Sequence, residues 1–247
     1  MIMNIARLIR PALFGAALLS AVPHAIAADM SRAEVEKIVR EYLLANPEIL
    51  NEMLSELKAR EEANATDRAK AAIASNRDAL LNDGYSYVAG NPNGDVTLVE
   101  FFDYRCGYCK KVRDDVVNFM GADTNVRVVF KEFPILGAAS IEASRAAIAS
   151  RKQGDDKYWA FHQAMLGADG LDSDAIYDIA AGQGIDVAKL KEDMKAPEVD
   201  QVITKNHELA EKIGIDGTPA FIVGDQLYPG ALDADELKAI VAAHRGG

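Results

Sequence analysis

Two cysteines separated by two residues, Cys106 and Cys109, have the type and spacing best suited to chemistry in this chain. A stretch of helical composition follows them as far as Met120. At the start of a helix, partial positive charge and free N–H groups stabilise Cys106 as a thiolate. A stabilised thiolate makes the disulfide more oxidising, and it also makes Cys106 a good leaving group from a mixed disulfide. We expect the helix to shield Cys109, which would then act as the resolving thiol.

Three interpretations of this pair are open. They are redox catalysis, a soft-metal site such as Cu(I) held by two thiolates, and an inert structural disulfide. The strand that precedes the pair and the helix that follows it favour redox catalysis. Lys110 and Lys111 are expected to add positive charge near the thiolate, and Tyr108 to tune the electrostatics of the disulfide ring and contact substrate.

Glu100 stands in the middle of a predicted strand, between Val99 and Phe101. A carboxylate in a strand that is covered on both faces is costly to desolvate unless it has a partner or a task, so we expect a raised pKa. Six residues before Cys106, it is placed to relay a proton to or from Cys109. The alternative is a glutamate that is salt-bridged or reaches solvent at a strand end.

Thr218 and Pro219 stand immediately before another predicted strand. A proline at this position cannot donate to the strand ladder and often marks a cis turn. The histidines are less informative, because neither His162 nor His207 has partners at metal-ligand spacing. We assign structural roles to both.

The predicted elements around these residues alternate between strand and helix. The apolar, β-branched runs 96–102 and 126–133 predict two strands covered on both faces, joined by the helix that begins at the cysteines. Helical stretches are predicted at 138–153, 155–166, 173–181, 186–194 and 198–213, which together form an all-helical insertion at about 138–213. The runs 220–223 and 226–228 flank Gly224-Asp225 as a hairpin, and a last helix is predicted at 233–244.

Before this domain, the sequence predicts helices with little to bury. Ser31 to Glu34 has the form of a capping box, and apolar residues follow at helical spacing. Asn46 and Pro47 then predict the start of a second helix. Two short apolar stripes cannot build a core, so we favour oligomerisation through residues 31–81, the alternative being a helical arm that folds back on the main domain. Glycine, asparagine and proline in 82–94 predict a linker, with the second domain beginning near Asp95.

The first 28 residues have the pattern of a cleaved signal peptide. Arg7 and Arg10 precede the apolar run 12–22, and Ala25-Ile26-Ala27 offers a cleavage site. An uncleaved membrane anchor is the alternative, but the run is about half of the ~20 residues needed to cross a bilayer. The pattern therefore predicts export to a disulfide-permissive compartment. We divide the chain into the signal peptide 1–28, a helical region 29–82 and a domain 83–247.

Composition excludes several classes of protein. The chain has 247 residues, with 27 lysines and arginines against 38 aspartates and glutamates, and a formal net charge of −11. No basic stripe accompanies this excess of acid, which argues against nucleic-acid binding. Since the chain has only two cysteines, four-cysteine zinc and iron–sulfur sites are excluded, as is a disulfide-stapled scaffold.

Four segments resemble the DsbA-like family. They are Val-Glu-Phe-Phe-Asp-Tyr-Arg-Cys-Gly-Tyr-Cys-Lys at 99–110, Phe-Pro-Ile-Leu at 133–136, Tyr-Trp-Ala-Phe-His at 158–162 and Gly-Thr-Pro-Ala-Phe at 217–221, within a resemblance that covers roughly 95–245. The segment 39–50 resembles the N-terminal helical region of the ScsC-type subgroup, the suppressors of copper sensitivity.

The resemblance implies a thioredoxin fold, an α/β fold here with a helical insertion and a preceding helical segment. It implies Cys106 as the attacking thiolate, Cys109 as the resolving thiol, Glu100 as the buried acid and Pro219 as a cis-proline facing the disulfide. Thr218 departs from oxidases close to DsbA, which usually carry valine there, and is common in isomerases and ScsC-type proteins. The Gly107-Tyr108 dipeptide also differs from the Pro-His of the best-known oxidase.

The sequence thus predicts a periplasmic thiol–disulfide oxidoreductase that acts on unfolded or misfolded exported proteins and leans towards isomerase or reductase activity. No cofactor beyond the redox-active Cys106–Cys109 disulfide and no metal site is expected. The expected membrane redox partner is DsbD-like, ScsB-like or DsbB-like. The alternatives are a DsbA-type dithiol oxidase and, from a different class, a Cu(I)-binding copper-tolerance protein.

Overall fold

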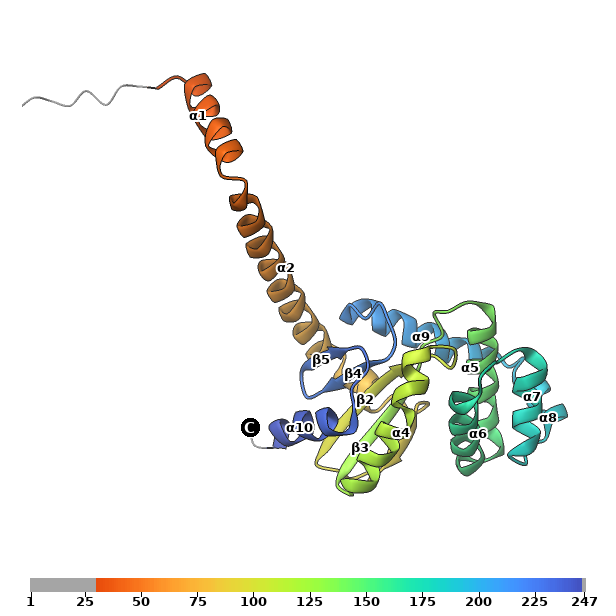
Figure 1. Ribbon diagram of the computed structural model, residues 1–247. Helices are drawn as coiled ribbons and strands as arrows, with labels where there is room; N and C mark the ends of the chain where they lie inside the picture. Colours follow the sequence, from red (N-terminus) through yellow and green to blue (C-terminus); the bar gives the residue numbers. More distant parts are fainter. Residues whose placement is uncertain (1–29, 246–247) are drawn as a thin grey trace, which may run out of the picture. The chain divides into compact units, whose positions relative to one another are not determined.

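A computed structural model describes residues 30–245 of the chain (Figure 1). The predicted signal peptide lies outside these residues. The elements are, in order, α1 Arg32–Ala45, α2 Glu48–Ser75, α3 Arg77–Leu81, β1 Tyr87–Gly90, β2 Val96–Phe102, α4 Gly107–Ala122, β3 Val126–Glu132, α5 Ala138–Ser150, a 3-10 turn Arg151–Gln153, α6 Asp155–Gly167, α7 Ser173–Gly182, α8 Val187–Asp193, α9 Pro197–Ile213, β4 Ala220–Val223, β5 Gln226–Pro229 and α10 Ala234–Arg245. None of the helices in this part of the chain is long and apolar enough to cross a membrane.

The strands form one five-stranded sheet in the order β1-β3-β2-β4-β5. β2 and β3, which α4 connects, pair in parallel. β1, β4 and β5 each pair antiparallel to their neighbours. The helices α5 to α9 lie between β3 and β4 in the chain and form the insertion (Figure 1). This is the α/β arrangement with a helical insertion that the sequence predicted.

Side-chain alternation along β2 divides the core between the two faces of the sheet. Leu98 and Phe102 belong to the cluster that includes apolar residues of α4, α10 and the insertion. Val99 and Phe101 belong to a second cluster with residues of α2, α3 and the C-terminal part of α9. Glu100 has the parity of Leu98 and Phe102, so its side chain is on the α4 face of the sheet.

The chain divides into two compact units between Ser55 and Glu56, and α2 continues through the boundary. In the first unit, the Ser31 hydroxyl accepts a hydrogen bond from the Glu34 amide, and the Glu34 carboxylate accepts one from the Ser31 amide. This is the predicted capping box. No residue of α1 is buried.

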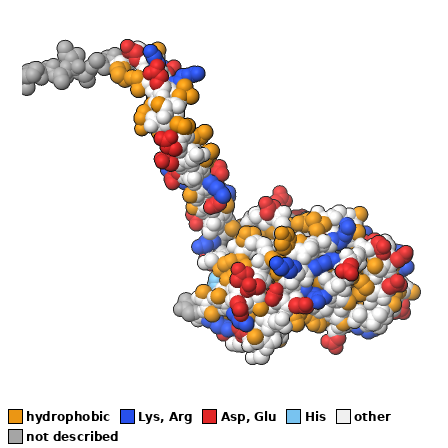
Figure 2. Space-filling model, viewed as in Figure 1, with side chains coloured by type: hydrophobic (Ala, Val, Ile, Leu, Met, Phe, Trp, Pro, Cys, Tyr) orange, Lys and Arg blue, Asp and Glu red, His pale blue; other side chains and the backbone are white. Residues whose placement is uncertain are grey.

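Exposed apolar side chains follow α1 and the first part of α2 (Figure 2). We call them the N-terminal apolar stripe: Val35, Ile38, Val39, Tyr42, Leu43, Leu44, Leu50, Met53, Leu54 and Leu57. Exposed apolar side chains gathered on two consecutive helices are the kind of surface at which proteins associate.

In the second unit, the end of α2 and α3 pack on the sheet. Ile73 and Leu80 are buried there. The Lys131 side chain is wholly buried, pairs with Asp83 and donates to the Ala79 carbonyl at 2.7 Å. Arg127 donates to the Leu81 carbonyl at 2.6 Å. Two basic residues of β3 therefore hold the carbonyl end of α3 against the sheet.

The interpretation of 82–94 as a linker was wrong, because this segment contains the edge strand β1. Tyr87–Gly90 pairs antiparallel with residues 127–130 of β3. Gly90 has φ +71°, and a Cβ there would lie 2.5 Å from the Val126 carbonyl oxygen. The glycine that indicated a turn is required by the close approach of two strands at the end of β1.

Candidate active site

Cys106 is the N-cap of α4, so its sulfur lies at the end of the helix where N–H groups are free. Its amide donates to the Asp103 carbonyl at 3.1 Å. Its thiol donates to the Thr218 carbonyl at 3.1 Å. The predicted residues Cys106 and Thr218 are therefore in contact although 112 positions separate them in the chain.

Hydrogen bonds lower the pKa of Cys106 to about 5. The largest contribution is from the Cys109 thiol, and the Thr218 side chain and the Cys109 and Tyr108 amides add to it, while burial opposes them. These donors stabilise the thiolate as expected for a helix N-terminus. Lys110, which we expected to add positive charge near the thiolate, donates its ammonium group to the Ala168 carbonyl at the end of α6.

Cys109 lies one turn into α4 and is fully buried. Burial raises its pKa, the hydrogen bond to Cys106 and the negative charge of Glu100 raise it further, and the Asp103 amide opposes them. Both cysteines are free thiols in this structure. The two sulfurs therefore differ strongly in acidity, one suited to attack and the other held as a thiol until it is needed.

Glu100 is buried, and burial raises the pKa of its carboxyl group to about 8. Its charge acts on Cys109, which agrees with its place on the α4 face of the sheet. Among the described residues, Glu100 forms no salt bridge, in contrast to the alternative considered from the sequence. A buried acid beside a thiol with a high pKa is suited to proton exchange.

Pro219 follows a cis peptide bond with Thr218, at the start of β4. The Phe101↔Ala220 register of β2 and β4 brings this turn beside the end of β2. The structure thus brings together all five predicted site residues. Tyr108, which is 65% exposed between the cysteines, is accessible for substrate contact.

Sequence reasoning missed a buried polar network beside the site. Glu132, at the end of β3, accepts hydrogen bonds from the Tyr104, Tyr158 and Ser144 hydroxyls at 3.0, 3.2 and 2.8 Å. The Tyr104 hydroxyl also lies 2.9 Å from Nδ1 of His162. Burial raises the pKa of Glu132 to about 8 and lowers that of His162 to about 3, so His162 is neutral. The only sequence signal was a second acid at the end of an apolar strand.

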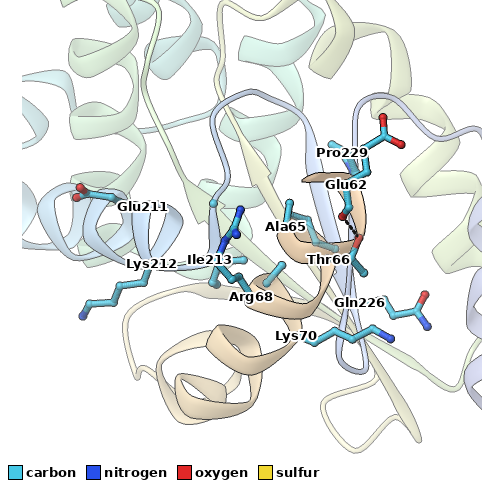
Figure 3. A pocket seen from close by; sticks show the side chains of 13 residues that line it. Glu62, Ala65, Thr66, Arg68, Lys70, Glu211, Lys212, Ile213, Gln226 and Pro229 are labelled. Atoms are coloured by element: carbon cyan, nitrogen blue, oxygen red, sulfur yellow. Dashed lines mark hydrogen bonds between the residues drawn. The ribbon is translucent and has the colours of Figure 1, made fainter. Parts of the chain in front are cut away.

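Among residues 30–245, no group of three or more His, Cys, Asp or Glu side chains is arranged to hold a metal ion. A cleft of about 650 Å³ in the second unit contains neither cysteine (Figure 3). It is lined by the second half of α2, the end of α9 and β5, with Arg68, Lys70 and Lys212 among its side chains (Figure 3). The thiol pair and its surroundings are therefore the candidate active site.

Comparison with known proteins agrees with this geometry. The model of the DSBA-like thioredoxin domain matches residues 97–242. The chain belongs to the DsbA-like family. The model of the copper resistance protein ScsC N-terminal domain matches residues 32–64, which include α1.

The DsbA-like chain is 46% identical to a thioredoxin-like oxidoreductase from Silicibacter pomeroyi, with a TM-score of 0.67 over 70% of this chain and 99% of that one. It is 33% identical to Proteus mirabilis ScsC in a transitional conformation, with a TM-score of 0.65 over 85% of this chain and 95% of that one. It is also 27% identical to the disulfide bond formation protein D of Bacillus subtilis, over 62% of this chain and 74% of that protein. Other curated relatives are Na(+)/H(+) antiporters named NhaA, such as that of Mycolicibacterium gilvum at 28% identity, and the DsbA-like chain spans about a quarter of their length.

The role of the Cys109 thiol in the acidity of Cys106 is directly testable. Replacing Cys109 with alanine is expected to raise the pKa of Cys106 from about 5 by about one unit or more, because the largest hydrogen bond to the thiolate is lost. A Cys109→Ser variant is expected to show a smaller rise, since its hydroxyl can still donate. The ultraviolet absorbance of the thiolate, followed against pH in the two single-cysteine variants, measures both shifts. An unchanged midpoint in the alanine variant contradicts this account.

Proposed function

We propose that the protein is an exported thiol–disulfide oxidoreductase that shuffles or reduces disulfides of misfolded proteins. The observation that carries the proposal is the pair of thiols at the start of α4, one with a pKa lowered to about 5 and the other buried beside Glu100. Membership of the DsbA-like family supports thiol–disulfide exchange. The signal-like pattern of the first 28 residues supports export to the periplasm.

In the proposed reaction, the Cys106 thiolate attacks a disulfide of the client, and one client sulfur leaves as a thiolate. Cys109 then loses its proton and attacks the Cys106 sulfur. The Cys106–Cys109 disulfide forms, the bond from Cys106 to the client breaks, and the client sulfur leaves as a thiolate that takes up a proton. The raised pKa of Glu100 suits it to accept the Cys109 proton and pass it on. The enzyme is oxidised by two electrons and the client is reduced by two.

Two observations favour isomerase or reductase activity over oxidase activity. Thr218 precedes the cis-proline, where the family resemblance gives threonine in isomerases and ScsC-type proteins and valine in oxidases close to DsbA. The N-terminal apolar stripe supports an oligomer, in which several active sites face one misfolded client. We propose that the stripe forms this oligomer and that a DsbD-like or ScsB-like membrane protein keeps the thiols reduced.

The test is reactivation of scrambled ribonuclease by the full mature chain in a glutathione buffer. Strong reactivation is expected, because an enzyme that can both attack and release non-native disulfides returns the client to its native pairing. Absence of reactivation combined with rapid oxidation of a reduced client would identify a DsbA-type oxidase instead. Tight, stoichiometric Cu(I) uptake in equilibrium dialysis, with negligible exchange, would replace the proposal by copper binding, which two adjacent thiols also permit.

A further inference from the structure

Arg105 stands directly before the attacking cysteine, and its backbone is fixed there. The Cys106 amide donates to the Asp103 carbonyl at 3.1 Å, which closes a turn with Arg105 inside it. The Arg105 amide donates to the Asp103 carboxylate at 2.7 Å. Asp103 is fully buried, and its carboxylate also accepts the amides of Ile135 and Leu136, at 2.8 and 3.0 Å, from the loop after β3. The backbone of Arg105 is therefore held beside Cys106 through a carboxylate that two parts of the chain fix in place.

The side chain of Arg105, in contrast, is exposed. Among residues 30–245, its guanidinium group has no salt-bridge partner. Two basic residues of α4 are already engaged, because Lys110 donates to the Ala168 carbonyl and Arg113 pairs with Asp114 at 2.8 Å. Arg105 is thus a cation next to the attacking sulfur whose side chain is free to bind a substrate.

The surface around the Cys106 sulfur is open to a client chain. A Cβ on Gly107, the first residue of α4, would meet no atom within 4 Å beyond its own stretch of chain. The same holds for Gly217, which precedes Thr218, the residue whose carbonyl accepts the Cys106 thiol at 3.1 Å. Neighbouring residues of a client are about 3.8 Å apart along its chain. When Cys106 attacks a client cysteine, the residues beside that cysteine therefore come within reach of the Arg105 side chain.

The charge of Arg105 is opposite to that of the protein as a whole. The chain has a formal net charge of −11, which repels acidic clients. The free N–H groups at the start of α4 add positive charge beside Arg105. The segment before the cis-proline carries an exposed acid instead, Asp216. Because arginine stays charged and binds carboxylates through paired N–H donors, an acidic client residue has a partner at the α4 side of the thiol.

We propose that Arg105 is a specificity-determining residue that binds aspartate or glutamate side chains beside the client cysteine under attack. The inference rests on the proposed function and adds to it the charge of the client segment that exchanges fastest. In this step, the Cys106 thiolate bonds to one client sulfur, the client disulfide breaks, and the other client sulfur leaves as a thiolate. Arg105 transfers no proton and acts only through its ion pair with the client.

Three short peptides test this with the reduced protein. Each has capped ends and one cysteine, placed between two aspartates, two lysines or two serines, and is linked through that cysteine to nitrothiophenol, an uncharged aromatic thiol. Attack of Cys106 on the peptide sulfur breaks this bond and releases yellow nitrothiophenolate, whose absorbance gives the rate. The serine peptide reports the reactivity of the thiolate itself, so the other two rates are divided by its rate. We call the ratio of the aspartate rate to the lysine rate the acid preference.

Arg105→Gln is expected to lower the acid preference about fivefold, and Arg105→Glu about fivefold further, as for single charges that meet near a protein surface. Arg105→Lys keeps the charge and should stay within about twofold of the wild type. Because the side chain is exposed, these variants are expected to fold. The matched control Arg68→Gln removes the same group from α2, in the cleft that contains neither cysteine, and should leave the acid preference unchanged.

A salt series gives a second measurement. At an ionic strength of about 1 M, where the Debye length is about 3 Å, the wild type and Arg105→Gln should differ in acid preference by less than about twofold. An unchanged acid preference in Arg105→Gln, or an equal fall in Arg68→Gln, would overturn the inference. A wild-type protein that releases no nitrothiophenolate from any of the three peptides would instead contradict the proposed function.

Discussion

Replacement of Cys106 by serine is expected to reduce thiol–disulfide exchange to the uncatalysed level, a loss on the order of 10³-fold or more. In the proposed reaction the Cys106 thiolate is the attacking group, and serine is not ionised at neutral pH. The other thiol does not substitute for it, because Cys109 is fully buried and its pKa is raised. Ribonuclease reactivation and the release of a coloured thiolate both measure the loss.

The matched variant Cys109→Ser separates the roles of the two sulfurs. It retains the attacking thiolate and lacks the resolving one, so it is expected to accumulate as a mixed disulfide with its client. Mass spectrometry of the product after non-reducing separation detects this species. If Cys106→Ser retained exchange, or if Cys109→Ser formed no mixed disulfide with a reactive client, the assignment of the two roles would be wrong.

The second large effect is expected from the N-terminal apolar stripe. A Val39→Glu and Leu43→Glu double variant places two charges on exposed apolar positions one turn apart on α1. Because an oligomer would bury this stripe, we expect the double variant to be a monomer and to lose most ribonuclease reactivation. Light scattering on a sizing column measures the mass.

Exchange with a small aromatic disulfide should change by less than about twofold in this variant, since α1 and the active site belong to separate compact units. Lys37→Glu is the control, because it changes the net charge by the same two units at a polar position where Lys37 pairs with Glu41. It should retain both the oligomer and the reactivation. Reactivation at the wild-type level by a monomeric variant would show that clustering of active sites is not required.

Long apolar segments and strong cap signals made much of the fold predictable from the sequence. β2 was predicted with its observed bounds, and the capping box at Ser31 marked the start of α1. β1 was not predicted, because it is short, ends in Gly90 and is followed by the turn residues 91–94, and only its pairing with β3 makes it a strand. Short edge strands depend on a neighbour that local sequence does not reveal.

The residues of the candidate site were likewise predictable only in part. The CxxC spacing, the acid within a strand and the Thr-Pro dipeptide are local patterns, and they identified five residues that the fold brings together. Asp103 and Glu132 were missed because their partners are distant in the chain, such as Leu136 for one and Tyr158 for the other. An acidic residue beside an apolar strand is ordinarily solvated, and only the fold shows that both are buried.

Trp159, the single tryptophan of the chain, stacks on the ring of His162 with 5.3 Å between centroids and lies beside Tyr87 of β1. Its fluorescence therefore comes from one place, the contact between the insertion and the edge of the sheet. Since the pKa of His162 is lowered to about 3, the imidazole is neutral above that pH, and protonated histidine does not quench the indole there. The protein thus has a built-in optical probe, with no added label, for separation of the insertion from the sheet.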